Sequence, residues 1–301
     1  MCCSNSSFIE CLRNHHTNHL SNIDINECTG ATFTSSTPCK HTGSHLPYNS
    51  GSHTFTNVDF KECYSSNDSG GAIKCTGTNT QLTVTGCTFK ECYVSLTSSY
   101  SGGGIYAHSI KSVSTQSSLF TNCYGYDGGG LFINSISSTP DFFDCVFISC
   151  QGQYLGGGAF VGKCSNGASP IACSDTSFIG CTNVSSSPKL YGGGFYLDIY
   201  AITHANTVSN VLFTQNSANM AGGALGIYES EHGFPYSVKF CFFSYNTASG
   251  NGKDVVLVRT TFNSILNSFT ASQGQNRLWV NLVSAELATP VNIPEYPNWL
   301  P

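Results

Sequence analysis

Cysteine is the residue type with the greatest chemical potential in this 301-residue chain, which has sixteen of them. In an exported protein, cysteines at regular spacing would pair as disulfides, and at suitable spacing they would bind zinc. In five successive copies of a repeat a cysteine follows a phenylalanine by three residues, and asparagine takes the same place in the next two copies: Cys63, Cys92, Cys123, Cys150, Cys181, Asn216 and Asn246. A position that accepts cysteine or asparagine favours a column of small buried residues, with disulfides and a metal site as alternatives.

Histidines are the second group of possible metal ligands. Six of the nine lie in the first 55 residues, close to three cysteines: His15, His16, His19, His41, His45 and His53, with Cys11, Cys28 and Cys39. Their spacing matches none of the established zinc motifs, so we interpret them as polar loop residues. No metal ligand and no cofactor is assigned.

Acid–base catalysis requires paired carboxylates, or a basic residue beside clustered carboxylates as in polysaccharide lyases. The closest acidic pair in the central part of the chain is Asp141 and Asp144, and a separation of three places them on opposite faces of a strand. Lys61 and Lys90 each precede a glutamate and are typical of solvated ion pairs. No catalytic residue is assigned.

Two short patterns alternate along the chain at a period near 30 residues. The first is Phe-x-x-Cys/Asn, which begins at Phe60, Phe89, Phe120, Phe147, Phe178, Phe213 and Phe243. The second is a glycine cluster before an apolar run, with glycine pairs at 70–71, 103–104, 129–130, 157–158, 193–194 and 222–223. Such a period, with short β-type runs and glycine punctuation, is typical of a parallel β-helix that has one coil per repeat.

We therefore predict an all-β chain that forms a single right-handed parallel β-helix, a solenoid of about seven to nine coils. The handedness follows from the general rule for crossover connections between parallel strands. Residues 1–55 are expected to form irregular N-terminal coils and a cap, and residues 56–252 the β-helix repeats. Residues 253–301 are expected to hold the last strands, a C-terminal cap and a proline-containing tail.

Side-chain alternation predicts which positions face the core. The phenylalanines should form an internal stack, and so should the second residue after each glycine pair: Ile73, Tyr106, Phe132, Phe160, Tyr196 and Leu225. The flanking positions should then face water, and in the central coils they form an apolar strip: Leu131, Ile133, Ala159, Val161, Phe195 and Leu197. An exposed apolar strip of this kind favours a binding surface. The alternative is that the segment 199–210 folds over it.

Charge restricts the partners of the chain. Charged residues make up 10% of it, and the net charge of −5 includes only 12 lysines and arginines, too few to neutralise a nucleic-acid backbone. No apolar run is long enough for a transmembrane segment, and no signal peptide is visible. The localisation is left open: extracellular or at the cell surface if a leader is missing, and cytoplasmic if the chain is complete.

The alternation of Gly-Gly-Ala-Ile at residues 70–73 with Phe-x-x-Asn at 213–216 and 243–246 resembles the repeats of the chlamydial polymorphic outer membrane proteins. The resemblance covers roughly residues 55–250. It implies a right-handed parallel β-helix of the pectin-lyase-like kind and a role in adhesion to cells. The chain departs from that family in having cysteine in most copies and a glycine triplet in several.

The combined evidence of the sequence favours a non-catalytic scaffold that presents an elongated surface to another macromolecule, as an adhesin-like surface protein does. The partner would be a protein or a glycan, and self-association is possible. An intracellular structural or assembly protein is the first alternative, and a carbohydrate-active lyase or hydrolase the second.

Overall fold

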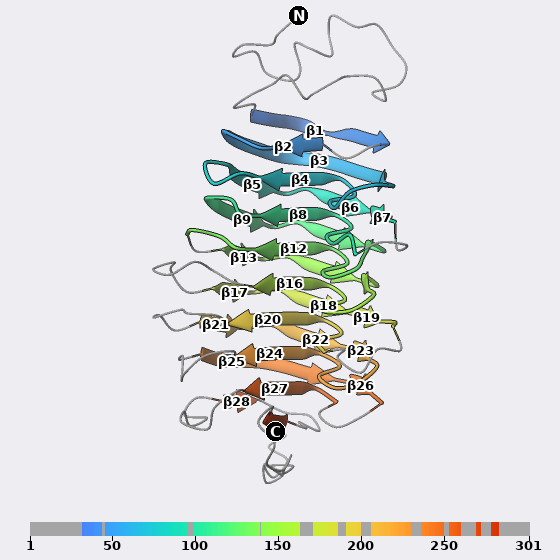
Figure 1. Ribbon diagram of the computed structural model, residues 1–301, viewed down its shortest axis with the longest axis vertical. Coiled ribbons are helices and arrows are strands. Elements are labelled where there is room, and N and C mark those ends of the chain that lie inside the picture. Colours follow the sequence, from blue (N-terminus) through green and yellow to red (C-terminus); the bar gives the residue numbers. More distant parts are fainter. Residues whose placement is uncertain are drawn as a thin grey trace, which may run out of the picture.

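The computed structural model of the chain describes residues 32–43, 46–95, 99–138, 140–162, 171–185, 191–199, 206–229, 236–249, 253–259, 269–271 and 278–282. Within these ranges it contains twenty-nine β-strands, and every pair of hydrogen-bonded strands is parallel. The coils stack along the long axis of the molecule to form a β-solenoid (Figure 1). An all-β parallel solenoid was predicted, and this part of the prediction is confirmed.

One side of each coil belongs to a nine-stranded sheet, in which the strands follow one another in chain order. Its strands are β2 (Leu46–Tyr48), β4 (Ile73–Thr76), β8 (Ile105–His108), β12 (Leu131–Asn134), β16 (Ala159–Gly162), β20 (Phe195–Ile199), β24 (Leu225–Glu229), β27 (Val255–Arg259) and β29 (Leu278–Leu282).

The other twenty strands form a second sheet, which bends twice and so has three rows. The first row contains β1 (Thr32–Gly43), β3 (Ser52–Ser65), β5 (Gln81–Thr85), β9 (Ser112–Gln116), β13 (Asp141–Phe143), β17 (Ala172–Ser174), β21 (Asn206–Ser209), β25 (Tyr236–Ser244) and β28 (Phe269–Ala271). The second row contains β6 (Thr88–Lys90), β10 (Leu119–Thr121), β14 (Val146–Ile148), β18 (Ser177–Ile179) and β22 (Leu212–Thr214), and the long strands β3 and β25 continue into it. The third row contains the end of β3 together with β7 (Tyr93–Val94), β11 (Tyr124–Gly125), β15 (Gln151–Gly152), β19 (Thr182–Asn183), β23 (Ser217–Ala218) and β26 (Thr247–Ala248).

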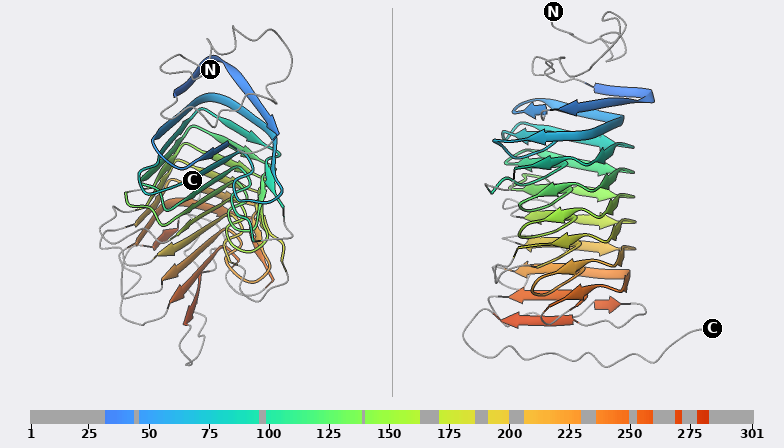
Figure 2. Two further views of the ribbon diagram at one scale, coloured as in Figure 1. Left: turned by 45° about the horizontal axis from the view of Figure 1, so that its top comes forward. Right: turned by 90° about the vertical axis from the view of Figure 1, so that its right-hand side faces the viewer.

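Residues with positive φ mark the bends between the rows (Figure 2). Each bend from the first to the second row has one such residue: Asn57, Gly86, Ser117, Asp144, Asp175, Asn210 and Phe240. Each bend from the second to the third row has another: Glu62, Glu91, Asn122, Ser149, Gly180, Gln215 and Tyr245. A left-handed residue other than glycine costs roughly 1–2 kcal/mol, so the contacts between coils must offset this cost at most bends.

The core between the sheets contains a stack of seven phenylalanine rings, one per coil. Neighbouring rings lie 4.6–5.2 Å apart between centroids and are parallel to within 4–7°. The members are Phe60, Phe89, Phe120, Phe147, Phe178, Phe213 and Phe243, and none is more than 1% exposed. Each ring pair adds roughly 0.5–1.5 kcal/mol beyond the burial of its apolar area. The predicted internal phenylalanine stack is confirmed.

The glycine clusters form the turns that lead into the nine-stranded sheet. The first glycine of each cluster has positive φ, and a Cβ atom on the second would clash with a backbone carbonyl oxygen of the next coil. The third position lies over the phenylalanine stack and is glycine in the central coils but alanine at residues 72 and 224. In the central coils even a Cβ atom would crowd the rings, since one at Gly158 would lie 2.7 Å from the Phe178 ring and one at Gly130 2.9 Å from the Phe147 ring.

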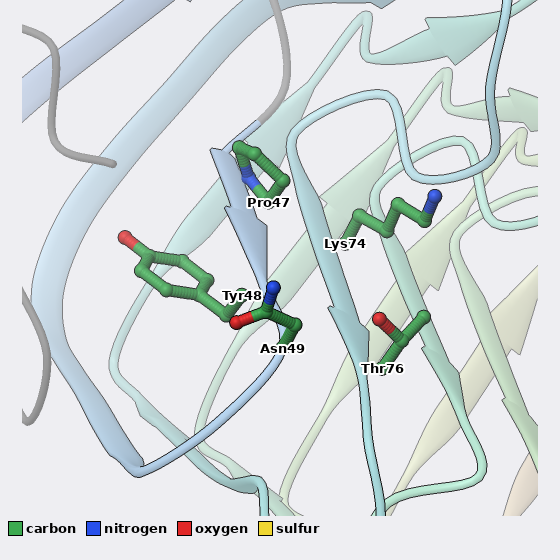
Figure 3. Close-up of a pocket in the computed structure, with 5 residues that line it drawn as sticks. All are labelled: Pro47, Tyr48, Asn49, Lys74 and Thr76. Atoms are coloured by element: carbon green, nitrogen blue, oxygen red, sulfur yellow. The ribbon is translucent and has the colours of Figure 1, made fainter. Parts of the chain in front are cut away.

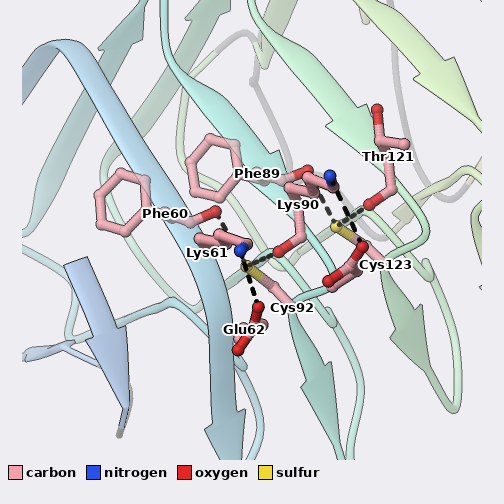
Figure 4. Close-up of polar contacts among 9 residues, drawn as sticks. Phe60, Lys61, Glu62, Phe89, Lys90, Cys92, Thr121 and Cys123 are labelled. Carbon is pink, nitrogen blue, oxygen red and sulfur yellow. Dashed lines mark hydrogen bonds and ion pairs between the residues drawn. The ribbon is translucent and has the colours of Figure 1, made fainter. Parts of the chain in front are cut away.

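The cysteine and asparagine side chains that follow the phenylalanines link each coil to the one before it. The Cys92 thiol donates to the Phe60 carbonyl at 3.5 Å, and the Cys123 thiol donates to the Phe89 carbonyl at 3.4 Å (Figure 4). The same contact recurs at Cys150 and Cys181, at 3.4 and 3.5 Å. Asn216 and Asn246 donate their amides to equivalent carbonyls at 2.9 and 3.0 Å. Both residue types therefore perform the same task, and we call this row of side chains the Cys/Asn column.

Ten cysteines lie in the described part of the chain with their side chains, and all ten are buried free thiols: Cys63, Cys75, Cys87, Cys92, Cys123, Cys145, Cys150, Cys173, Cys181 and Cys241. Burial raises the pKa of Cys87 to about 11 and that of Cys145 to about 12. Burial also raises the pKa values of Cys123 and Cys150. Because these thiols stay protonated, the cysteines of the Cys/Asn column can donate their S–H hydrogens to the phenylalanine carbonyls.

The sequence also predicted a division of the chain into residues 1–55, 56–252 and 253–301. Strands β1, β2 and β3 already pair in the solenoid sheets before residue 56. Most of the expected caps lies outside the described residues, so the division stays a prediction. None of the described residues forms a helix long and apolar enough to cross a membrane.

The Cys/Asn column generates a stability prediction at Cys150. Replacing Cys150 by Asn should leave the unfolding midpoint in urea nearly unchanged, because asparagine supplies a donor for the Phe120 carbonyl. Replacing Cys150 by Ala should cost about 1–3 kcal/mol, because that carbonyl loses its partner and the side chain leaves a void. Equal losses in the two variants would show that asparagine cannot substitute for cysteine in the column.

Candidate functional site

The six apolar residues that were predicted to form an exposed binding strip lie in the core instead. Leu131, Ile133, Ala159, Val161, Phe195 and Leu197 are at most 1% exposed and belong to the main hydrophobic cluster between the sheets. The predicted orientation of this strip is therefore wrong. The alternative of a covering segment at 199–210 falls partly on residues outside the described ranges, and the burial of the strip does not depend on it.

The error arises from a shift of one residue between glycine clusters. Strand register pairs Ile73 with Ile105 and Ile105 with Leu131, so Gly70 is equivalent to the first glycine of the triplet at 102–104. The predicted orientation instead follows from matching the last two glycines of each triplet to the Gly-Gly of Gly-Gly-Ala. Since side chains alternate along a strand, one residue of slip turns every central strand inside out.

The aromatic residues that were expected in the core consequently lie on the outer side of the nine-stranded sheet. Tyr106, Phe132, Phe160 and Tyr196 stack there with centroid distances of 4.8–5.6 Å. Turn residues from the glycine-containing bends pack over them, including Leu155, Tyr191 and Met220. Because Phe132, Phe160 and Tyr196 are buried under this cover, they form a small second core and not a docking surface.

A partly exposed apolar strip does exist, on the outer side of the second row. Of the ten residues that flank the stacked phenylalanines from Phe120 to Phe243, Thr121, Ser177, Thr214 and Ser244 are polar. The other six form the strip: Leu119, Val146, Ile148, Ile179, Leu212 and Phe242. All of these side chains remain partly accessible, and Phe242 is 43% exposed. We call this set the second-row strip.

The sequence held a signal for the second-row strip. Once the phenylalanines are placed inside, alternation turns their immediate neighbours outward. The neighbours are polar or charged around Phe60 and Phe89, where Lys61 and Lys90 pair with the next glutamate at 2.9 and 3.7 Å. They become apolar around Phe147, where Val146 and Ile148 stand.

The described titratable groups do not converge on an acid–base or metal site. Among the described residues, no group of three or more His, Cys, Asp or Glu side chains is arranged to hold a metal ion. Asp144 occupies a bend and accepts a hydrogen bond from Ser117 Oγ at 2.8 Å, while Asp141 lies on β13, where burial raises its pKa. Only Phe142 and Phe143 lie between the two carboxylates in the chain, so no nucleophile stands between them.

The histidines of the N-terminal segment fall largely outside the described residues, as His15, His16, His19 and His45 do. His53 is described and is buried against the ring of Tyr48, with a centroid distance of 4.0 Å. Its Nε2 lies 2.6 Å from the Ser50 carbonyl, and burial lowers its pKa, which favours the neutral ring. His53 is therefore part of the packing and not the exposed loop residue that was predicted.

A small open pocket lies at the β2 end of the nine-stranded sheet (Figure 3). Its lining residues are Pro47, Tyr48, Asn49, Lys74 and Thr76. The Lys74 ammonium group is paired with the carboxylate of Asp68, so the positive charge of the lining is neutralised locally. The pocket thus offers neither a free charge nor a nucleophile, and we assign it no catalytic role.

Comparison of the chain with protein-family models, with curated proteins and with solved structures gave no match.

The two apolar strips differ in one testable property. Replacing Ile133 by Asp should lower the free energy of unfolding by several kcal/mol or prevent folding, because the carboxylate would be buried in the core. Replacing Ile148 by Asp should change it by less than about 1 kcal/mol, because this side chain reaches water. Urea unfolding followed by circular dichroism compares the two, and equal stability would contradict the orientation described here.

Proposed function

We propose that this chain is a non-catalytic β-solenoid scaffold that presents an elongated surface to another macromolecule, in the manner of an adhesin-like surface protein. The observation that carries the proposal is the second-row strip, in which apolar side chains pair between neighbouring coils as Leu119 with Val146, Ile148 with Ile179 and Leu212 with Phe242. Contiguous apolar groups that face water commonly mark a surface to which a partner binds.

The geometry of the strip suits an elongated partner. Its members are held by parallel strands, so they are fixed in position before binding and little conformational entropy is lost when a partner docks. The strip extends over five coils, from Leu119 to Phe242. Burial of its apolar area by a partner would contribute roughly 25 cal/mol per Å² to the free energy of binding.

The resemblance of the repeats to those of the chlamydial polymorphic outer membrane proteins supports the adhesive role, because these repeats are associated with adhesion to cells. With this resemblance we also expect a right-handed solenoid of about seven to nine coils. The rule for parallel crossover connections supports the handedness. Glycine turns precede six strands of the nine-stranded sheet. The three other strands of this sheet, β2, β27 and β29, lie at its ends and raise the expected number of coils above six.

Adhesion is tested with beads that carry the purified protein and are applied to cultured epithelial cells. We expect the parent protein to attach, and a variant with both Ile148→Asp and Ile179→Asp to attach at least tenfold less, because two carboxylates would have to be desolvated at the interface. Attached beads are counted by microscopy. The matched control carries Ser174→Asp and Ser209→Asp, which place two charges on the outer side of the first row.

Either of two outcomes would contradict the proposal. Parent-coated beads that attach no better than beads without protein would exclude the adhesin function. Equal attachment of the Ile148/Ile179 variant and the parent would exclude the second-row strip as the contact surface. Circular dichroism must first show that both double variants keep the β-structure of the parent.

A second candidate, an intracellular structural or assembly protein, is favoured by the ten buried free thiols. Free thiols persist in reducing compartments, whereas exported proteins tend to oxidise theirs. Alkylating the denatured, unreduced natural protein and measuring its mass gives the number of free thiols. A value near sixteen would support the intracellular candidate, while several disulfides would indicate export and support the adhesin.

A further inference from the structure

The outer face of the third row carries an unbroken column of uncharged hydrogen-bonding side chains. Strand register places one member of this column in each of seven successive coils. The members, in order along the rod, are Tyr64, Tyr93, Tyr124, Gln151, Thr182, Ser217 and Thr247. At about 4.8 Å per coil the column is about 29 Å long. We call it the third-row column.

Tyrosines concentrate at the N-terminal end of this face. Tyr64 and Tyr93 are 37% and 43% exposed, and their rings stack with a centroid distance of 4.5 Å. Tyr126 follows the last residue of β11 directly, and its ring stacks on Tyr154 at 5.5 Å. Five partly or largely exposed tyrosines thus lie on neighbouring coils at this end.

The surroundings of the third-row column are electrically neutral. The bend residues beside it include Glu62 and Glu91, and each is paired with the preceding lysine. From the third coil onward the bend residues are Asn122, Ser149, Gly180, Gln215 and Tyr245, none of which is charged. Apart from these two lysine–glutamate pairs at the N-terminal end, the bend residues offer a charged partner no opposite charge.

We propose that the third-row face binds a neutral glycan chain that lies lengthwise along the rod. Hydroxyl and amide groups repeat once per coil and can donate and accept hydrogen bonds, as the hydroxyl groups of a sugar chain do. The tyrosines add an apolar body and a polar tip in the same side chain. A mainly apolar partner would instead select the second-row strip, which lies on a different row.

The face differs from the second-row strip in residues and chemistry, so the two proposals can fail independently. The second-row strip is apolar and is the surface proposed for the macromolecular partner. The third-row column is polar and uncharged, and its recognition would depend on hydrogen bonds. A variant with both Ile148→Asp and Ile179→Asp should therefore keep glycan binding.

The test uses the full-length chain with a fluorescent label on a printed array of neutral, sialylated and sulfated glycans. We expect signal on neutral glycans. A variant with both Tyr93→Ala and Tyr124→Ala should need at least tenfold more protein for the same signal. The variant with both Tyr93→Phe and Tyr124→Phe keeps the rings, folds as the parent does, and should lose a smaller part of the binding. The control Phe240→Ala, which removes a 72% exposed ring at a different bend, should bind as the parent does.

Three results would overturn the proposal. Signal restricted to sialylated or sulfated glycans would show that charge dominates recognition. Signal that is unchanged in both tyrosine variants would place the glycan elsewhere on the protein. An array without any signal would mean that this face does not bind glycans, and a protein partner would then be the explanation for its exposed tyrosines.

Discussion

The phenylalanine stack and the Cys/Asn column lie three residues apart in every coil, on the two sides of a bend whose residue has positive φ. The stack sets the spacing of the rings through van der Waals contact. The column ties the carbonyl of each stacked phenylalanine to the side chain of the following coil. Together they hold in place a left-handed backbone that glycine alone would adopt without cost. The rows, and the faces they present, depend on these bends.

The two residue types of the column differ in strength and in reach. An asparagine amide donates to the phenylalanine carbonyl while its oxygen accepts from the backbone N–H of the preceding coil, as Asn216 does with Cys181 at 2.9 Å. A thiol is a weaker donor, but cysteine is also a small apolar residue that tolerates complete burial. The change from cysteine to asparagine between Cys181 and Asn216 thus alters the polarity of the core without altering the path of the chain.

The architecture could be predicted from the sequence because its determinants recur in every repeat. The phenylalanines, the following cysteine or asparagine, and the glycine turns recur about every 30 residues, and each recurrence supports the others. The orientation of the nine-stranded sheet could not be predicted, because Gly-Gly-Ala and Gly-Gly-Gly can be aligned in two ways. What decides the alignment is the limited space above the phenylalanine rings, which keeps the third position of each cluster small. That contact is tertiary, so the sequence shows only its result, a glycine or an alanine at this position. The apolar face on the second row follows from the sequence only when alternation is applied to the strands that hold the phenylalanines.

The direction of the hydrogen bonds determines how the molecule would respond to mechanical force. The backbone hydrogen bonds between parallel strands join successive coils, so they run along the axis of the rod. A force that pulls the two ends apart would break the hydrogen bonds between one pair of coils at a time. The rod would then unfold stepwise, and each step would release the chain length of one coil. Traction at right angles to the axis would not separate the coils in this way. A scaffold built from such coils is therefore mechanically anisotropic, and attachment along a lateral face loads it in its more resistant direction.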